Sequence, residues 1–215
     1  MRPSRLLLGL ALTLSGAAGT AQTVSRDDAV TLYGAYRGGG GFTDATSGQT
    51  LRLNDSGAGA ISYDRGLDGS RQLQLYASYQ STGLRLDRSA VVNPPAGSGA
   101  APAPLPIKVM YFHIGGVSYF DGPIGRGPYV VGGIGATVFA PGSSGTHDEV
   151  RPSLNLGIGY QSALGERVAL RLEARGYVTV VNSSAGLFCS GGCVLKIKGD
   201  SVTQGEVQLG VSYRF

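Results

Sequence analysis

The chain has 215 residues, of which 36 are Gly, 10 Pro, 11 Tyr and 2 Cys, and it contains no Trp. Gly is more than twice as frequent as the ~7% of an average protein, but no Gly-X-Y period accompanies it, which excludes collagen. Hydrophobic residues make up 42%, which excludes a wholly disordered chain, whereas charged residues make up 15%, well below the ~25% of a typical soluble domain. This composition is typical of a crowded β protein and unusual for a cytoplasmic enzyme.

The first 21 residues have the order of a secretory signal peptide. Arg2 and Arg5 precede an apolar core over 6–14, and small residues follow up to Ala21, after which we expect cleavage. A buried N-terminal helix or an inner-membrane anchor are the alternatives, but the apolar stretch is shorter than the ~20 residues that a spanning helix needs. We therefore expect a mature domain over 22–215. Loss of the two arginines lowers its formal charge from +4 to +2, which gives no reason to expect a nucleic-acid partner.

Eight strands are predicted in the mature region. Successive side chains of a strand point to opposite faces, so alternation of polar and apolar residues indicates a strand with two unlike faces. Six segments alternate in this way, at about 30–37, 51–64, 72–80, 154–161, 168–180 and 206–215. Two more segments, about 108–120 and 128–139, are apolar on both faces. Their β-branched and aromatic content predicts strands but leaves the faces unassigned.

The connections between these strands alternate between short and long. Short turns are expected at 65–70, 121–127 and 162–166. Longer connections fall at about 38–49, 85–106, 140–151 and 182–200. Both ends of the mature chain then lie on the side of the short turns. An even number of antiparallel strands, with short turns at one end and long loops at the other, is typical of a bacterial outer-membrane barrel.

The alternation itself does not say which face is inside. A secreted β-sandwich or a lipocalin-like barrel gives the same pattern with the apolar face inward. Scarce charge, polar faces that carry both signs, and a final strand ending on Phe215 favour the membrane barrel, in which an Arg or Lys on the lipid face costs roughly 2–4 kcal/mol. We therefore predict an all-β, eight-stranded, antiparallel up-and-down transmembrane β-barrel. Its lumen is expected to hold a polar network of Arg37, Arg171, Glu173, Arg175, Glu206 and Arg214.

The last strand carries a resemblance to a known group of proteins. Val207, Leu209, Val211, Tyr213 and Phe215 alternate with other residues up to the terminal Phe. This pattern resembles the assembly signal of Gram-negative outer-membrane barrels, which the barrel assembly machinery reads. With the signal peptide and the strand count, the chain is similar to the OmpA transmembrane domain, OmpX, OmpW and the opacity-type adhesins. Nothing follows Phe215, so we do not expect the peptidoglycan-binding domain of full-length OmpA.

Candidate catalytic residues are few, because the chain has two histidines. His113 lies in a predicted strand, where a lumen or core hydrogen bond is the expected role. His147 is followed by Asp148 and Glu149 in a loop, an order that does not fix a metal geometry. Lipid A-modifying barrels use a His with Ser and an acid, and the sequence has no His-x-Ser pair. We expect no catalytic, cofactor or metal site.

Cys189 and Cys193 flank a Ser-Gly-Gly segment in the last long loop. Export exposes the two thiols to an oxidising compartment, which favours a disulfide that staples the tip of the loop. A zinc site is the alternative, but it needs more ligands than these two cysteines.

The expected function follows from the size of the barrel. Eight strands enclose a lumen just wide enough for side chains or one small ligand. We expect a non-enzymatic outer-membrane protein with a largely filled lumen that contributes to envelope integrity or surface interaction. The alternatives are a small-solute or apolar-compound channel, as likeness to OmpW implies, and a lipid A-modifying enzyme. The expected partners are outer-membrane lipid and lipopolysaccharide, the assembly machinery and a surface partner of the long loops, with the protein a monomer.

Overall fold

The structure is a computed structural model that describes residues 28–43, 50–86, 105–142, 147–181, 186–189, 193–196 and 201–215, the segments 186–189 and 193–196 as backbone alone. The expected signal peptide lies outside the described residues. In the described part of the chain no helix is long and apolar enough to span a membrane.

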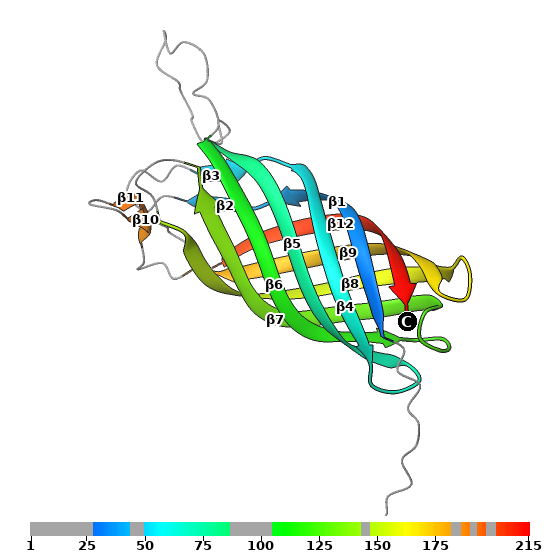
Figure 1. The fold of residues 1–215 in the computed structure, drawn as a ribbon. Coiled ribbons are helices and arrows are strands. Elements are labelled where there is room, and N and C mark those ends of the chain that lie inside the picture. The colour runs from blue at the N-terminus through cyan, green and yellow to red at the C-terminus, as the bar shows by residue number, and fades with distance from the viewer. Residues whose placement is uncertain are drawn as a thin grey trace, which may run out of the picture.

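Eight long strands form a closed barrel (Figure 1). They are β1 (Ala29–Gly39), β4 (Ser56–Gly66), β5 (Arg71–Leu86), β6 (Leu105–Tyr119), β7 (Gly127–Pro141), β8 (Glu149–Ala163), β9 (Val168–Val180) and β12 (Ser201–Arg214). Each strand is antiparallel to both of its neighbours, and pairing of β1 with β12 and of β5 with β6 completes the ring. The predicted fold class is confirmed.

Two small hairpins belong to the long connections. β2 (Gly41–Thr43) and β3 (Thr50–Leu53) continue the first hairpin beyond the barrel wall, and β3 also pairs with β5. The chain bends between β1 and β2 at Gly39 and Gly40, whose φ angles of 80° and 94° lie in the left-handed region that favours glycine. β10 (Gly186–Cys189) and β11 (Cys193–Lys196) form a separate pair in the last connection.

The short turns lie at one end of the barrel, together with the end of β12 (Figure 1). Ala29 is the register partner of Arg214, and the Phe215 N–H donates to the carbonyl oxygen of Asp28 at 3.0 Å. The first and last strands are thus joined up to their ends. We refer to this side as the turn end and to the opposite side as the loop end.

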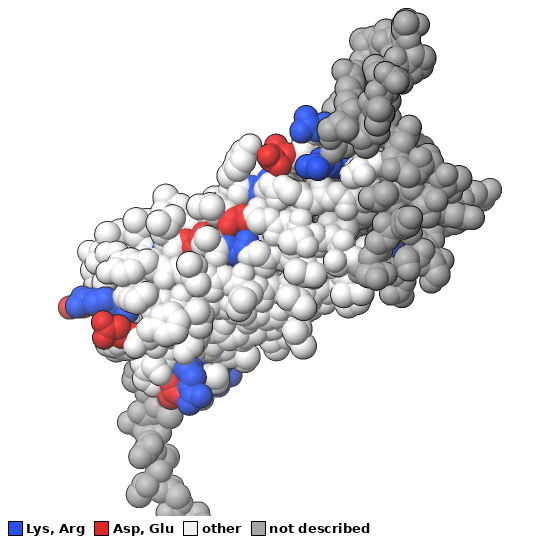
Figure 2. Space-filling view, turned by 180° about the vertical axis from the view of Figure 1, so that it is seen from behind, with Lys and Arg blue, Asp and Glu red and all other residues white. Residues whose placement is uncertain are grey.

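The outer face of the barrel wall is an apolar belt. Leu32, Ile134 and Leu156 are 62%, 70% and 68% exposed, although they lie near the middle of their strands. Apart from Phe112 in the middle of β6, the exposed aromatic side chains lie toward both edges of this belt, as in transmembrane barrels: Tyr36 and Tyr79 toward the loop end, and Phe120, Tyr160, Tyr213 and Phe215 toward the turn end. Figure 2 shows a largely white outer surface with charged side chains gathered mainly toward the two ends.

As predicted, the polar face of the barrel wall points inward and the apolar face points outward. Polar side chains on the predicted lumen face are buried, including Gln74, Glu173 and Gln208, each at most 2% exposed. The structure also assigns the faces of β6 and β7, which the sequence left open. Their inward residues include Tyr111, Val117, Tyr129 and Phe139, so this side of the lumen is mainly aromatic and apolar.

Candidate functional site: the filled barrel interior

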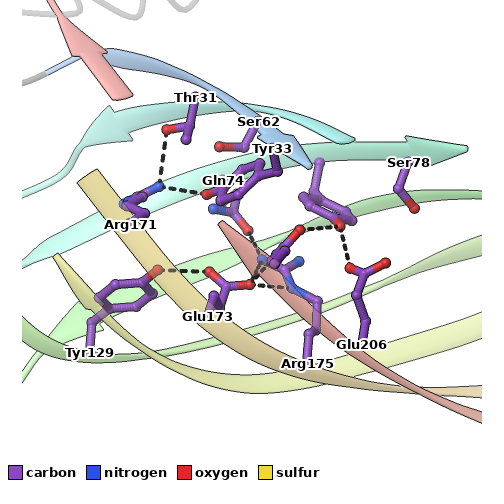
Figure 3. Close-up of polar contacts among 12 residues, drawn as sticks. Thr31, Tyr33, Ser62, Gln74, Ser78, Tyr129, Arg171, Glu173, Arg175 and Glu206 are labelled. Atoms are coloured by element: carbon purple, nitrogen blue, oxygen red, sulfur yellow. Dashed lines mark hydrogen bonds and ion pairs between the residues drawn. The ribbon is translucent and has the colours of Figure 1, made fainter. Parts of the chain in front are cut away.

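Three buried ion pairs occupy the barrel interior, and Figure 3 shows the pair of Arg175 with Glu173. They join Arg37 to Glu206, Arg171 to Asp64 and Arg175 to Glu173, and every one of these six side chains is at most 1% exposed. Three positive and three negative groups balance, as burial away from water requires. Alternation predicted five of the six residues as inward but did not say which would pair.

Arg171 lies at the centre of the group nearest the turn end. Its Nη1 is 2.7 Å from Asp64 Oδ2 and also donates to the Tyr33 hydroxyl at 3.1 Å. Its Nη2 donates to the Tyr119 hydroxyl at 2.9 Å, and its Nε donates to Gln161 Oε1 at 2.9 Å. One guanidinium thus bridges strands from opposite sides of the barrel.

Glu173 organises the middle of the lumen (Figure 3). Its Oε1 accepts hydrogen bonds from Arg175 Nε at 2.7 Å and from Gln208 Nε2 at 2.6 Å, and its Oε2 accepts one from the Tyr129 hydroxyl at 2.9 Å. Arg175 also lies 3.9 Å from the centre of the Tyr76 ring, a cation–π contact. The carboxylate is therefore satisfied by three donors from three strands.

Glu206 organises the group nearer the loop end. Arg37 Nε donates to its Oε2 at 2.7 Å, while the hydroxyls of Tyr76 and Tyr177 donate to its Oε1 at 3.0 and 2.8 Å. The Arg37 guanidinium lies 4.8 Å from the ring centre of Tyr111 and 5.0 Å from that of Tyr177. At this level the stacked rings of Tyr111 and Tyr177, together with the Arg37–Glu206 ion pair, fill the cross-section of the lumen.

Two lumen glycines make room for tyrosine rings. A Cβ atom at Gly210 would lie 2.4 Å from Tyr33 Cδ1, and one at Gly159 would lie 2.3 Å from Tyr129 Cζ. Each tyrosine is the register partner of the glycine that it covers. A small-solute channel, the alternative that the sequence left open, would need free space beside such glycines. In the structure that space holds side chains.

Apolar side chains close both ends of the lumen. Toward the loop end, Phe42, Leu53, Leu84, Phe139 and Val202 belong to one buried cluster. Toward the turn end, Ile124 from the turn between β6 and β7 packs with Val117, Tyr119, Tyr129 and Val131. Its backbone N–H donates to the Gly69 carbonyl oxygen at 3.1 Å, which fixes that turn against the neighbouring one.

His113 has a serine partner that the sequence did not reveal. Its Nε2 lies 2.9 Å from Ser153 Oγ, two strands away, and its ring stacks near Tyr111 and Tyr177. The strand between them carries Gly135 at the matching register position, so no side chain separates the two groups. Among the residues that the structure describes, none forms a hydrogen bond with His113 Nδ1, so the pair has no acid there of the kind that orients a catalytic histidine.

The other predicted site residues lie at the turn end of the lumen, on the outer face or in a loop. Arg214 is at the turn end, where its Nη2 donates to the Glu166 carbonyl oxygen at 2.7 Å. Val207, Leu209, Val211, Tyr213 and Phe215 are exposed on the outer face. His147 and Asp148 are exposed, and no group of three or more His, Cys, Asp and Glu side chains suited to a metal occurs in the described part of the chain.

The cysteine prediction falls on residues whose side chains lie outside the described part of the structure. Cys189 and Cys193 are register partners in the β10–β11 hairpin. The disulfide therefore stays a prediction.

The lumen network also contains Asp64 and five inward tyrosines that the prediction from the sequence omitted. Asp64, Tyr76 and Tyr177 share the polar parity of their strands, so alternation alone was a sufficient signal for them. Tyr111, Tyr119 and Tyr129 lie on the strands that are apolar on both faces, where the sequence carried no such signal.

Comparisons with known proteins concern the fold. No protein-family model matches the chain, and no curated protein sequence is significantly similar to it. Among solved structures, the outer membrane protein AlkL in lipid bilayers has 14% sequence identity and a TM-score of 0.52, with 100% of this chain and 97% of that chain covered. Neisserial surface protein A has 14% identity and a TM-score of 0.50, with 87% and 97% covered. The chain thus has the fold of small outer-membrane β-barrels.

Proposed function

We propose that this protein is a closed, non-enzymatic barrel of the Gram-negative outer membrane that contributes to envelope integrity or surface interaction. The observation that carries this proposal is the filled lumen, in which three neutralised ion pairs and the tyrosines around them occupy the space that a solute would need. An apolar outer belt with aromatic edges supports the membrane location.

The orientation and biogenesis follow from the same architecture. In barrels of this kind the short turns face the periplasm and the long loops face outward. The long connections of this chain are then the part available to a surface partner. The exposed alternation from Val207 to Phe215 is proposed as the signal for the barrel assembly machinery, and the closed ring of paired strands supports a monomer.

A channel or a lipid-modifying enzyme has less support. Tyr33 and Tyr129 cover Gly210 and Gly159, the lumen glycines that a conduit would use. The His113–Ser153 pair faces the interior, at most 6% exposed, and no acidic side chain in the described part of the chain bonds to its Nδ1. Lipid substrates would meet the outer face instead.

Single-channel recording in planar bilayers tests the proposal. Refolded full-length protein should give no stable conductance steps. A Tyr111→Ala/Tyr177→Ala variant, which removes two stacked rings from the lumen, should show conductance, whereas the matched outer-face variant Tyr79→Ala/Tyr160→Ala should stay closed. Discrete steps from the unaltered protein would contradict the proposal.

A further inference from the structure

The turn between β6 and β7 folds across the turn end of the lumen, whereas the other two short turns lie outside it. Residues 120–126 form this turn, which lies beside the end of β12 (Figure 1). Its residue Ile124 is 6% exposed, while Leu67 and Leu164, the apolar residues of the other two turns, are 58% and 66% exposed. We refer to residues 120–126 as the strap. The strap thus buries the kind of side chain that its neighbours leave in contact with solvent.

Two glycines allow the strap to turn inward. Gly122 and Gly125 have φ angles of 112° and 95°, in the left-handed region that favours glycine. They lie two positions before and one position after Ile124, so the backbone can rotate on both sides of the buried residue. A Cβ atom at Gly125 would lie 3.3 Å from Arg214 Nη1, so glycine also lets the strap pass close to the end of β12. Such residues at the two sides of a moving segment are typical of a hinge.

An apolar anchor and a backbone hydrogen bond hold the strap in place. The Ile124 side chain packs in the apolar cluster of the turn end, and its N–H donates to the Gly69 carbonyl oxygen at 3.1 Å. This carbonyl belongs to the turn between β4 and β5. The Asp68 carboxylate accepts hydrogen bonds from the backbone N–H groups of Ser70 and Arg71 at 2.9 and 2.8 Å, which fixes that turn. The neighbouring turn is therefore a rigid catch for the strap.

A small cavity lies between the strap and the polar network of the lumen. Its volume is about 20 Å³, enough for one water molecule. Ile124 and Gly125 line it from the strap, and Gln161, Arg171 and Ser212 are among the residues that line it from the barrel wall. Outward movement of Ile124 would connect solvent at the turn end with the Arg171 guanidinium. The apolar cluster at the loop end would stay closed, because it lies at the opposite end of the barrel.

We propose that the strap is a gate that admits water and small solutes to the turn end of the lumen. Surface segments held by few contacts open at free energies far below that of global unfolding, and the strap joins one buried side chain to two hinge glycines. The gate opens one end of the barrel, so its motion exposes the Arg171–Asp64 pair to solvent without forming a channel. This inference rests on the proposed closed lumen and adds a means of regulating access to it.

Cysteine labelling of the refolded full-length chain in detergent tests the gate. The reporter is Ser212→Cys in a Cys189→Ser/Cys193→Ser background, because Ser212 lines the cavity and is 2% exposed. Methanethiosulfonate ethylammonium, a small thiol reagent, should modify this cysteine slowly but completely, as followed by mass spectrometry. Adding Ile124→Ala should raise the labelling rate roughly tenfold or more, because loss of the buried side chain favours the open strap.

Two controls restrict the effect to the strap. Leu164→Ala, which shortens the exposed apolar residue of a neighbouring turn, should leave the rate at the Ser212→Cys reporter unchanged. A second reporter, Val202→Cys, lies in the loop-end cluster at 1% exposure and should stay unlabelled with or without Ile124→Ala. Heat-modifiable mobility on gels checks that each variant is folded.

Three outcomes would overturn the inference: no labelling of the Ser212→Cys reporter while the strap is unaltered, equal acceleration by Leu164→Ala, or labelling of the Val202→Cys reporter once Ile124 is shortened. The first would show a static plug, and the third would show opening of the whole barrel. Failure of the closed-lumen proposal has a different signature, since it requires conductance steps from the unaltered protein.

Discussion

The ring of Tyr33 lies directly over Gly210, its register partner across the β1–β12 pair, so that a Cβ atom at position 210 would be 2.4 Å from the ring. The same contact places the Tyr33 hydroxyl 3.1 Å from Arg171 Nη1. One missing side chain on β12 thus sets the position of an aromatic ring, and the ring helps to hold a buried guanidinium. In this barrel, a glycine on the lumen face leaves room for a neighbouring aromatic ring, and that ring fills the lumen.

Gly210→Ala is expected to destabilise the barrel. The added methyl group forces the Tyr33 ring to move within a filled lumen, and such overpacking costs typically about 1–3 kcal/mol. Gly34→Ala is the control, because Gly34 is exposed on the outer face and a Cβ there meets nothing within 4 Å. Urea unfolding of refolded protein, followed by circular dichroism, measures both. Equal unfolding midpoints for the two variants would refute the packing role of Gly210.

Glu206→Gln is expected to destabilise the barrel more strongly. It leaves the Arg37 guanidinium buried without its counter-charge, a loss that typically costs ~3–5 kcal/mol. The double variant Arg37→Met/Glu206→Gln should recover most of this stability, since no uncompensated charge remains and the amide still accepts from Tyr76 and Tyr177. The same unfolding measurement applies. A double variant less stable than Glu206→Gln would contradict this account.

The turn between β4 and β5 gives a pH-dependent prediction. The backbone N–H of Ser70, together with Arg71, lowers the pKa of Asp68 from its ordinary value of 3.8 to about 2. The unfolded chain therefore binds this proton more readily, so the contribution of Asp68 to stability is full above about pH 4 and is lost as the pH falls toward about 2.

The variant Asp68→Asn removes the charge and the acceptor of Arg71 Nε, while its amide oxygen still accepts from the backbone N–H groups of Ser70 and Arg71. Its unfolding midpoint should lie below that of the unaltered protein at pH 7, and the two midpoints should converge as the pH falls from about 4 to about 2. Asp121→Asn, in the exposed turn between β6 and β7, serves as the comparison. A difference that stays constant down to pH 2 would show that charge at Asp68 is not its source.

Phe215→Asp is expected to reduce assembly into the outer membrane. The terminal aromatic side chain is 61% exposed on the outer face, where it is accessible to the assembly machinery. Phe120→Asp is a matched control, since Phe120 is 66% exposed near the same end of the barrel but lies outside the last strand. Heat-modifiable protein in membrane fractions measures assembly, and equal yields for both variants would argue against a signal in the terminal strand.

The cysteine pair is expected to be oxidised in exported protein. Denatured protein should show no reactive thiol before reduction and two after it, because an oxidising compartment favours the disulfide and the intervening Ser-Gly-Gly can close the ring. The Cys189→Ser/Cys193→Ser variant gives the background of the assay. Two reactive thiols before reduction would exclude the disulfide.

Alternation in the sequence determined the fold class and most faces. In β12, Glu206 and Gln208 point inward while Val207 and Leu209 point outward, because successive side chains of any strand lie on opposite faces. The scarcity of charge then indicated which face meets lipid, since a charged side chain in hydrocarbon is costly. These are properties of single strands, so a single sequence was sufficient to predict them.

Tertiary structure decided the partners and the faces of β6 and β7. Asp64 and Arg171 are 107 positions apart and meet only because the ring closes across the lumen. Strands with apolar residues on both faces carry no alternation, so only their pairing in the barrel directs Tyr111 and Tyr129 inward. The register between two strands decides which side chain fills the space left by a glycine. Register is a property of the assembled sheet, so the periodicity of one strand does not predict it.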